Sequence, residues 1–229
     1  MSNPLPNALH TNLLLSKKGF TTSSILKDDS STDKLFEVIL DVQHRRLRIE
    51  SNYREPLSVA LSGQSLNALC DETCSLLTDI GVKPPLERPS FLEGIRGLFD
   101  SKQVKAYWKA VSSTKQVLKK IKAELRGETS PIHLHVDALS LSLIWYCKDV
   151  PDVSLLEQLE FGFSTGDEKF PDAYFFISSF PDTRALKKIL TDENRYRFTR
   201  DSSEMILPYS EVFKSKNSEK TLLDFYRSV

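Results

Sequence analysis

Leu35-Phe-Glu-Val-Ile-Leu-Asp-Val42 is the stretch of this chain that decides its fold class. Every second residue in it is apolar, so four side chains share one face of an extended strand: Phe36, Val38, Leu40 and Val42. The next residues, Gln43-His44-Arg45, are typical of a turn, and Arg46–Ser51 continues the alternation with Leu47 and Ile49 inward. The segment therefore predicts a β-hairpin that turns one face toward a core.

Strand patterns also occur on both sides of this hairpin. The predicted strands are Thr11–Ser16, Gly19–Ile25, Leu57–Leu61, Pro131–Cys147, Glu157–Phe163 and Ala173–Ser179, with an extended piece at Glu204–Leu207. A turn at Lys18-Gly19 joins the first two strands, and the loop Ser164–Asp172 joins the last two. Because short connections favour antiparallel pairing, we expect a hairpin at each place.

Two long stretches have the three- and four-residue spacing of helices instead. Ser65–Ile80 is followed by Gly81, which suits the left-handed end of a helix, and Ser101–Arg126 has Ser101 as its expected N-cap and ends before Gly127. Shorter helices are predicted at Thr183–Leu190 and Ser218–Arg227. The order of elements predicts an α+β fold, a mostly antiparallel β-sheet packed by two long α-helices and a C-terminal helix.

Length and composition favour a single domain over residues 1–229, with residues 1–8 as a loosely ordered N-terminal segment. The N-terminus lacks the pattern of a secretory signal, and the apolar stretches are too short to span a bilayer. The three cysteines show no disulfide spacing. We therefore expect a soluble protein in the cytoplasm with no membrane partner.

The charge balance argues against a nucleic-acid-binding protein, since 31 basic residues face 31 acidic ones. One side of the second long helix is basic, but no aromatic residues alternate with its lysines for base stacking. A solvated helix face explains those lysines better.

Motifs with a strong chemical meaning are absent: the sequence has no phosphate-binding glycine loop, nucleophile elbow, paired Cys-x-x-Cys or zinc-protease helix. The best remaining group is Ile132-His-Leu-His-Val-Asp137, in which His133, His135 and Asp137 share one face of a strand. Such side chains suit a metal site with a further ligand from elsewhere, a general base with its partner, or simply a solvated strand face. The sequence assigns no residue as a metal ligand and indicates no cofactor.

The residues that follow complicate this interpretation. Leu139, Leu141, Leu143 and Trp145 have the same parity as the two histidines, so an unbroken strand would place the histidines on an apolar face. Either the strand bulges or turns near Asp137-Ala138, or the histidines line a partly buried pocket.

Aromatic residues gather in the later strands. Phe161, Phe163 and Tyr174 are the candidates for a pocket wall, with Phe170, Phe175, Phe176 and Phe180 close in sequence. Packing between paired strands is the alternative interpretation of the same pattern.

Several short motifs, in order along most of the chain, resemble those of a bacterial family known only as domain of unknown function 5996. They are Leu9-His-Thr-Asn-Leu-Leu-Leu-Ser-Lys-Lys-Gly-Phe-Thr-Thr-Ser24, Leu35–Leu47, Tyr107-Trp108-Lys-Ala, Ser130-Pro-Ile-His133 and Leu207-Pro-Tyr-Ser-Glu-Val212. The family has no established activity to carry over.

The resemblance singles out His10, His44 and His133 as positions where family members also carry histidine. His135 has no such counterpart, which favours His133 acting with residues of other strands. Leu9 stands where the family has tryptophan, and Val82–Phe99 departs from the family's acidic, histidine-containing stretch.

Two hypotheses follow. In the first, an enzymatic or ligand-binding pocket has His133 as general base or ligand with His10 as partner, and His44, His135, Asp137 and the aromatic residues contact the ligand. In the second, the protein is a non-catalytic interaction domain with structural histidines. The sequence leaves open whether the partner is a small molecule or a protein, whether the chain forms homo-oligomers, and whether it is an enzyme.

Overall fold

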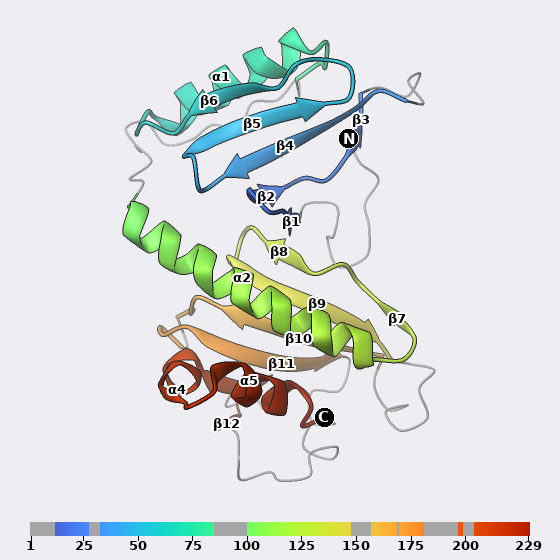
Figure 1. Ribbon diagram of the computed structural model, residues 1–229, viewed down its shortest axis with the longest axis vertical. Helices are drawn as coiled ribbons and strands as arrows, with labels where there is room; N and C mark the ends of the chain where they lie inside the picture. The colour runs from blue at the N-terminus through green and yellow to red at the C-terminus, as the bar shows by residue number, and fades with distance from the viewer. Residues whose placement is uncertain are drawn as a thin grey trace. The chain divides into compact units, whose positions relative to one another are not determined.

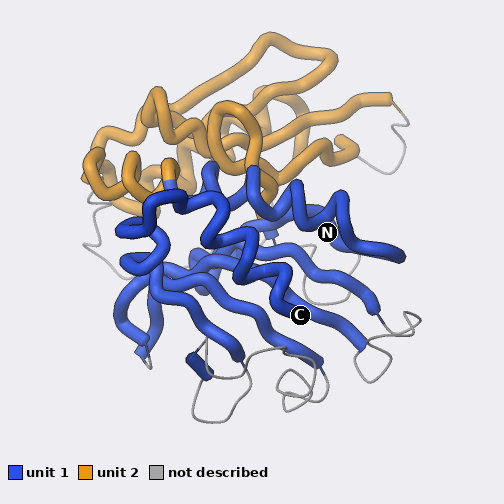
Figure 2. Tube along the Cα trace, turned by 60° about the horizontal axis from the view of Figure 1, so that its bottom comes forward, with its two compact units in different colours: residues 1–12, 110–229 blue, residues 13–109 orange. Residues whose placement is uncertain are grey.

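The computed structural model describes residues 12–27, 33–84, 100–147, 157–168, 170–180, 197–198 and 204–229. His10, the segment 1–8, the predicted helix Thr183–Leu190 and residues 85–99 of the predicted connection lie outside the described residues. The chain forms two compact units (Figure 2). Unit 1 is Met1–Asn12 with Ala110–Val229, and unit 2 is Leu13–Lys109. The prediction of a single domain stays a prediction.

Unit 2 is built on antiparallel strands and includes helix α1 (Figure 1). Its strands run in the order β1-β2-β4-β5-β6, and β3 pairs with β4. The elements are β1 (Leu13–Leu15), β2 (Gly19–Thr21), β3 (Ile25–Leu26), β4 (Leu35–Asp41), β5 (Arg46–Ser51), β6 (Leu57–Ala60) and α1 (Leu66–Asp79). The hairpin predicted from Leu35–Val42 is the β4–β5 pair, in which Val38 faces Ile49 and Leu40 faces Leu47.

The apolar face of this hairpin packs against α1. Phe36, Ile49 and Ile80 form the buried centre, surrounded by half-buried side chains such as Leu76. Ser65 caps α1 by accepting a hydrogen bond from the Ala68 amide at 3.1 Å, and Gly81 ends it with a φ of +77°. The two-residue and 3.6-residue patterns thus meet in one core.

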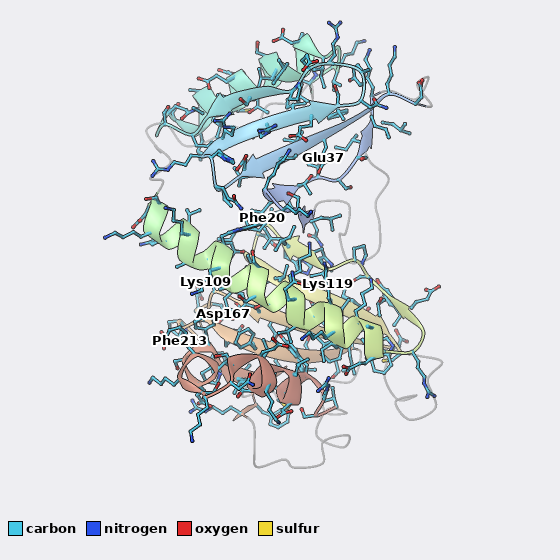
Figure 3. The ribbon with its side chains drawn as sticks, in the orientation of Figure 1. Phe20, Glu37, Lys109, Lys119, Asp167 and Phe213 are labelled. Carbon is cyan, nitrogen blue, oxygen red and sulfur yellow. The ribbon has the colours of Figure 1, made fainter. Side chains whose placement is uncertain are left out.

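Gly19 permits the close approach of β2 to β4. A Cβ atom at this position would lie 1.8 Å from the carbonyl oxygen of Leu40, so no other residue fits without moving the strand. Phe20 (Figure 3) follows it and packs against Tyr107 and Trp108 of α2 (Ser101–Glu124), with ring centroids at 5.9 and 5.4 Å.

Helix α2 (Ser101–Glu124) contains the boundary between the units. The expected N-cap is corrected by one residue, because the Asp100 carboxylate, and not Ser101, accepts from the Lys102 amide at 2.8 Å. Gly127 follows the helix with a φ of +89°, as expected. The buried part of the helix belongs to unit 1: Val111, Thr114, Val117, Leu118 and Ile121.

Unit 1 is also built on antiparallel strands, which run in the order β12-β13-β11-β10-β9-β8, with β7 paired to β9. The elements are β7 (Glu128–Thr129), β8 (His133–His135), β9 (Ser140–Tyr146), β10 (Gln158–Ser164), β11 (Tyr174–Phe180), β12 (Arg197–Phe198), β13 (Glu204–Pro208), α4 (Tyr209–Lys214) and α5 (Ser218–Tyr226). The α+β class and the mostly antiparallel sheet are therefore confirmed. No helix in the described part of the chain is both long and apolar enough to cross a membrane.

The two faces of this sheet differ. On one face, Phe161 meets Tyr226 of α5 edge to face at 5.9 Å, and ion pairs join α2 to α5 through Lys120–Glu219 and Arg227–Glu124. On the other face, cross-strand partners place His133, Ser142, Gly162, Phe176 and Ile206 in one row across five strands. The first face is the helix-covered core, and the second carries the polar side chains.

The single strand predicted at Pro131–Cys147 is two strands joined by a turn. The chain turns at residues 136–139, where Leu139 has a φ of +48°, and β9 starts at Ser140. The turn shifts the parity, so His133 and His135 lie opposite Ser142 and Ser140 and not beside the leucines of β9. Of the alternatives that the sequence left open, a turn at Asp137-Ala138 is the one that occurs.

Candidate functional site

Strands β8, β9 and β10 bring four polar side chains together on the open face of the unit 1 sheet. His133 and His135 come from β8, Ser142 from β9 and Glu160 from β10. Small residues in the centre of this face, Ser142 and Gly162, leave room for longer side chains to meet across them. We call these four side chains the histidine cluster.

His133 is the buried member of the histidine cluster, with 1% of its surface exposed. Its Nδ1 lies 2.8 Å from the Pro131 carbonyl oxygen, which only accepts hydrogen bonds, so Nδ1 carries the proton. Burial lowers the pKa of His133 most, the electrostatic effect of His135 adds to this, and the bond to Pro131 and the charge of Glu160 oppose it. The ring is therefore neutral near pH 7, with Nε2 as an acceptor.

The atoms around Nε2 of His135 indicate which ring nitrogen carries the proton. This nitrogen lies 3.1 Å from His133 Nε2, 3.1 Å from Ser142 Oγ and 3.3 Å from Glu160 Oε1. Because the His133 nitrogen and the Glu160 carboxylate both accept, Nε2 of His135 is the donor. The two rings meet edge to face, with centroids 4.6 Å apart.

Glu160 stays ionised in this setting. Burial works against its charge, but hydrogen bonds from His135 and Ser142 and favourable electrostatic interactions with the two imidazoles outweigh burial and lower its pKa. Ser142 is fully buried and lies 3.4 Å from His133 Nε2. The hydroxyl and the carboxylate thus complete a set in which every donor has an acceptor.

A pocket of about 660 Å³ opens beside the histidine cluster. His135 and Glu160 line it, whereas His133 and Ser142 lie behind them. The other lining residues come from the turn after β8, the ends of the strands and the β10–β11 loop: Asp137, Ala138, Leu139, Ser140, Ser164, Thr165, Gly166, Asp167, Glu168, Phe176 and Glu204. Five carboxylates line the pocket, and its described lining contains no lysine or arginine.

The loop after β10 is held to the sheet by Asp167 (Figure 3). Its carboxylate accepts from the Phe170 amide at 2.8 Å and from the Tyr174 hydroxyl at 2.9 Å. Burial, the bond to Asp167 and the charge of Glu204 raise the pKa of Tyr174, so the phenol stays protonated. This wall of the pocket is therefore fixed by side-chain hydrogen bonds.

The aromatic residues predicted from sequence lie in two places. Phe161 packs on Tyr226, and Phe163 packs on Phe175 at 5.4 Å and on Tyr209 at 5.8 Å. Tyr174 is buried behind the pocket wall, and the aromatic ring that lines the pocket is that of Phe176. Phe176 lies against Gly162, where a Cβ atom would come within 2.3 Å of Cζ.

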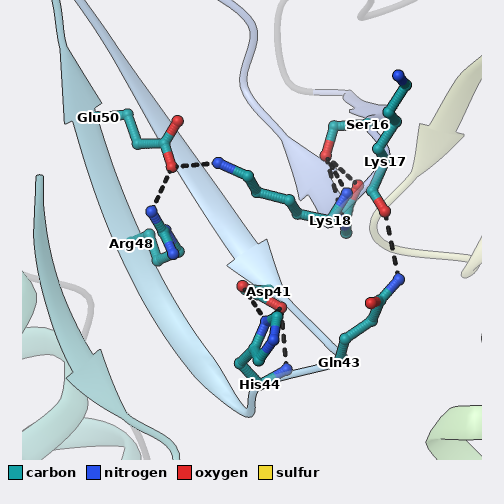
Figure 4. Close-up of polar contacts among 9 residues, drawn as sticks. Ser16, Lys17, Lys18, Asp41, Gln43, His44, Arg48 and Glu50 are labelled. Atoms are coloured by element: carbon teal, nitrogen blue, oxygen red, sulfur yellow. Dashed lines mark hydrogen bonds and ion pairs between the residues drawn. The ribbon is translucent and has the colours of Figure 1, made fainter.

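His44 belongs to unit 2 and forms a local pair there (Figure 4). Its Nδ1 lies 2.9 Å from Asp41 Oδ2, and its backbone amide donates to Asp41 Oδ1 at 2.9 Å. Beside this turn, Lys18 and Arg48 both contact Glu50, at 2.6 and 2.7 Å. The structure thus brings His133, His135 and the neighbouring turn residue Asp137 to one site, while the expected partner His10 lies outside the described residues.

A metal centre does not emerge from the described residues, which contain no group of three or more His, Cys, Asp or Glu side chains arranged to hold an ion.

Sequence reasoning did not single out Glu160 or Ser142 for this site, whereas it named Phe176 within the aromatic group that could wall a pocket. One signal was available for Glu160, a charged residue with the opposite parity to Leu159, Phe161 and Phe163 within a buried strand. No comparable signal marks Ser142, because serine is common on strands and its role depends on its neighbours.

The chain belongs to a family of unknown function, DUF5996, whose model matches residues 2–229. The resemblance seen in the sequence motifs is thereby confirmed. Neither a curated protein nor a solved structure matches the chain.

Proposed function

We propose that unit 1 binds a small, positively charged molecule in the pocket beside the histidine cluster. The observation that carries the proposal is the lining itself, which combines five carboxylates and a histidine with no lysine or arginine among its described residues. A pocket of about 660 Å³ is of the size that proteins use for small ligands.

Electrostatics favour a cation over a neutral or anionic ligand of the same shape. Glu160 is ionised at the pocket wall, and Glu168 is exposed at the β10–β11 loop. At about 6 Å in water, one carboxylate attracts a unit positive charge by roughly 0.7 kcal/mol, which is about threefold in affinity. Several carboxylates around one ligand add to this preference and repel an anion.

Phe176 supplies the apolar part of the pocket. Because Gly162 lacks a side chain, the Phe176 ring lies down on the sheet, and it is packed against Tyr174 with centroids 6.3 Å apart. An aromatic face next to carboxylates suits an organic ammonium or guanidinium group, which gains from both.

The test uses three probes of similar size and different charge: phenethylamine, 2-phenylethanol and phenylacetate. In NMR titrations of the full chain, phenethylamine should shift the signals of Ser164–Glu168 and Phe176. The neutral and anionic probes should bind at least about threefold more weakly. Equal or tighter binding of phenylacetate, or no shifts with any probe, would contradict the proposal.

A matched pair of variants checks the role of charge. Glu168→Gln removes a carboxylate at the pocket and should weaken phenethylamine binding roughly threefold. Glu128→Gln makes the same change at an exposed position of β7, away from the pocket lining, and should leave the affinity unchanged.

A second candidate function, protein interaction, rests on Phe213 of α4 (Figure 3). Its side chain is 71% exposed and stacks on Tyr209, which in turn stacks on the buried Phe175. An exposed aromatic ring supported in this way suits contact with another protein, and a second copy of the chain is the case to test first. Sedimentation should show self-association that Phe213→Ser abolishes and that Phe180→Ser, at a 54% exposed position of β11, does not. A monomer at all concentrations argues against self-association.

A further inference from the structure

We infer that the pocket is an active site in which His135 removes a proton from the bound molecule through its Nδ1 atom. The inference rests on the proposed function, because it requires a ligand in this pocket. It goes beyond binding, since it assigns a reaction class, a reacting atom and supporting residues.

The assignment of the reacting atom follows from the hydrogen bonds of the histidine cluster. His133 holds its own proton on Nδ1 because the Pro131 carbonyl lies 2.8 Å away, so its Nε2 accepts. That acceptor and the Glu160 carboxylate both face Nε2 of His135, which must therefore carry the proton of a neutral ring. The lone pair of His135 is left on Nδ1.

Accessibility separates His135 from the other members. Its ring lines the pocket and 23% of its side chain is exposed, whereas His133 and Ser142 are buried. The hydrogen bonds and the ion pair of His135 all involve Nε2, and Nδ1 forms none with the described residues. His135 is thus the one member of the cluster with both an accessible ring and an uncommitted lone pair.

The neighbours of His135 suit the charge that proton removal creates. When Nδ1 takes a proton, the ring becomes an imidazolium, and Glu160 at 3.3 Å balances the new positive charge. His133 and Ser142 contact Nε2 at 3.1 Å each and fix the ring orientation. Glu160, His133 and Ser142 are therefore positioning residues, because they act through His135.

The step balances without an oxidant or reductant. A C–H or N–H bond of the ligand breaks, its electron pair stays on the ligand, and an N–H bond forms at His135 Nδ1. The reverse step returns the proton. A positive charge on the ligand makes the neighbouring hydrogen more acidic, so the ligand class proposed above fits this reaction.

The probe for base activity is 5-nitrobenzisoxazole. A base takes the hydrogen from its ring carbon, the C–H electron pair forms the nitrile, and the N–O bond breaks to leave a coloured phenolate. The native chain should accelerate this elimination, and His135→Gln should reduce the acceleration roughly a hundredfold. Phenethylamine should slow the reaction of the native chain by filling the same pocket.

A second measurement reports the tautomer directly and does not depend on turnover. Nitrogen NMR of the native chain should show the His135 proton on Nε2 and the lone pair on Nδ1. In Glu160→Gln, the carboxylate that balances the imidazolium is lost, so the elimination rate should fall, while the acceptor Nε2 of His133 should keep the His135 proton on Nε2. Glu128→Gln, the exposed control, should keep both the native tautomer and the native rate.

The outcomes separate the two proposals. Phenethylamine binding together with elimination that requires His135 supports both. Binding with equal elimination by the native chain and His135→Gln, or a native His135 proton on Nδ1, overturns the proton-transfer inference and leaves the binding proposal standing. Elimination that requires His135 without any preference for phenethylamine overturns only the cationic ligand class.

Discussion

Each unit of this protein contains a histidine paired with a carboxylate, and the two pairs differ in almost every other respect. In unit 2, His44 and Asp41 are three residues apart, the carboxylate is buried, and 61% of the histidine side chain is exposed. In unit 1, His135 and Glu160 come from different strands, lie beside a pocket and have a second histidine behind them. The first pair holds a turn together, while the second has the surroundings of a reactive site.

The difference shows that the same two residue types can occur in quite different settings. Burial of the carboxylate and the distance in sequence between the partners distinguish these settings better than the residue types do. Asp41 binds the backbone amide of His44 as well as its ring, so its position serves the hairpin. The hydrogen bonds that lower the pKa of Glu160 come from side chains. At this point the sheet is held by the backbone pairing of β10 with β9. Four predictions, from the largest expected effect to the smallest, test this contrast.

The largest effect is expected for Gly19→Ala, which breaks the strand pairing that supports Asp41. Gly19 and Asp41 are cross-strand partners, and the added Cβ would lie 1.8 Å from the Leu40 carbonyl oxygen. We expect the free energy of unfolding to fall by about 3 kcal/mol in urea unfolding of the full chain. Ser58→Ala, at an exposed position of β6, is the control and should cost little. A native stability for Gly19→Ala would show that β2 can move away from β4.

Asp41→Ala should destabilise the chain by about 2 kcal/mol, because it removes a buried acceptor of charge-assisted hydrogen bonds. His44→Ala keeps the bond between the backbone amide and Asp41, so it should cost less than about 1 kcal/mol. Chemical unfolding of both variants gives the comparison. Equal losses would mean that the ring, and not the turn amide, is the main partner of Asp41.

The histidine cluster of unit 1 and the His44–Asp41 pair of unit 2 should also respond to acid in different pH ranges. Burial lowers the pKa of His133 below its usual 6.5, so the unfolded chain binds this proton first and stability decreases as the pH falls below about 6.5. Burial of Asp41 raises its pKa, but the bonds from His44 outweigh burial and lower it below 3.8, so its contribution is lost only under more acidic conditions. Each unit of pKa shift corresponds to about 1.4 kcal/mol.

Unfolding midpoints of the native chain and of His133→Gln over a pH series measure this difference. The variant should lose the decrease below pH about 6.5 and keep the one at lower pH. If both chains show the same profile down to pH 5, the imidazole of His133 is not the group responsible.

The smallest effect on stability is expected for Glu160→Gln. The amide preserves the shape of the side chain and can still hydrogen-bond, so unfolding should change by less than about 1 kcal/mol. Phenethylamine binding should nevertheless weaken roughly threefold, because a carboxylate of the pocket is lost. A loss of stability as large as that of Asp41→Ala would instead assign Glu160 the same structural role as Asp41.

Sequence reasoning was most successful where a pattern depends on one element alone. The alternation in Leu35–Val42 identified β4, and the spacing in Ser65–Ile80 identified α1 with both of its ends. It was less successful at Pro131–Cys147, where two strands and a turn share an apolar composition. Parity alone could not decide there, because a four-residue turn changes which side chains share a face.

The sequence by itself determined the class of the fold, since the two- and 3.6-residue periods and the helix caps are local properties of the backbone. It also placed His133, His135 and Asp137 on one strand face, although it chose His10 as the catalytic partner of His133. Only the tertiary structure decided which groups surround the two rings, because the Pro131 carbonyl, Ser142 and Glu160 come from different turns and strands. The position of a ring proton depends on which acceptors lie beside the ring nitrogens. Strand pairing, and not distance along the chain, brings those acceptors there.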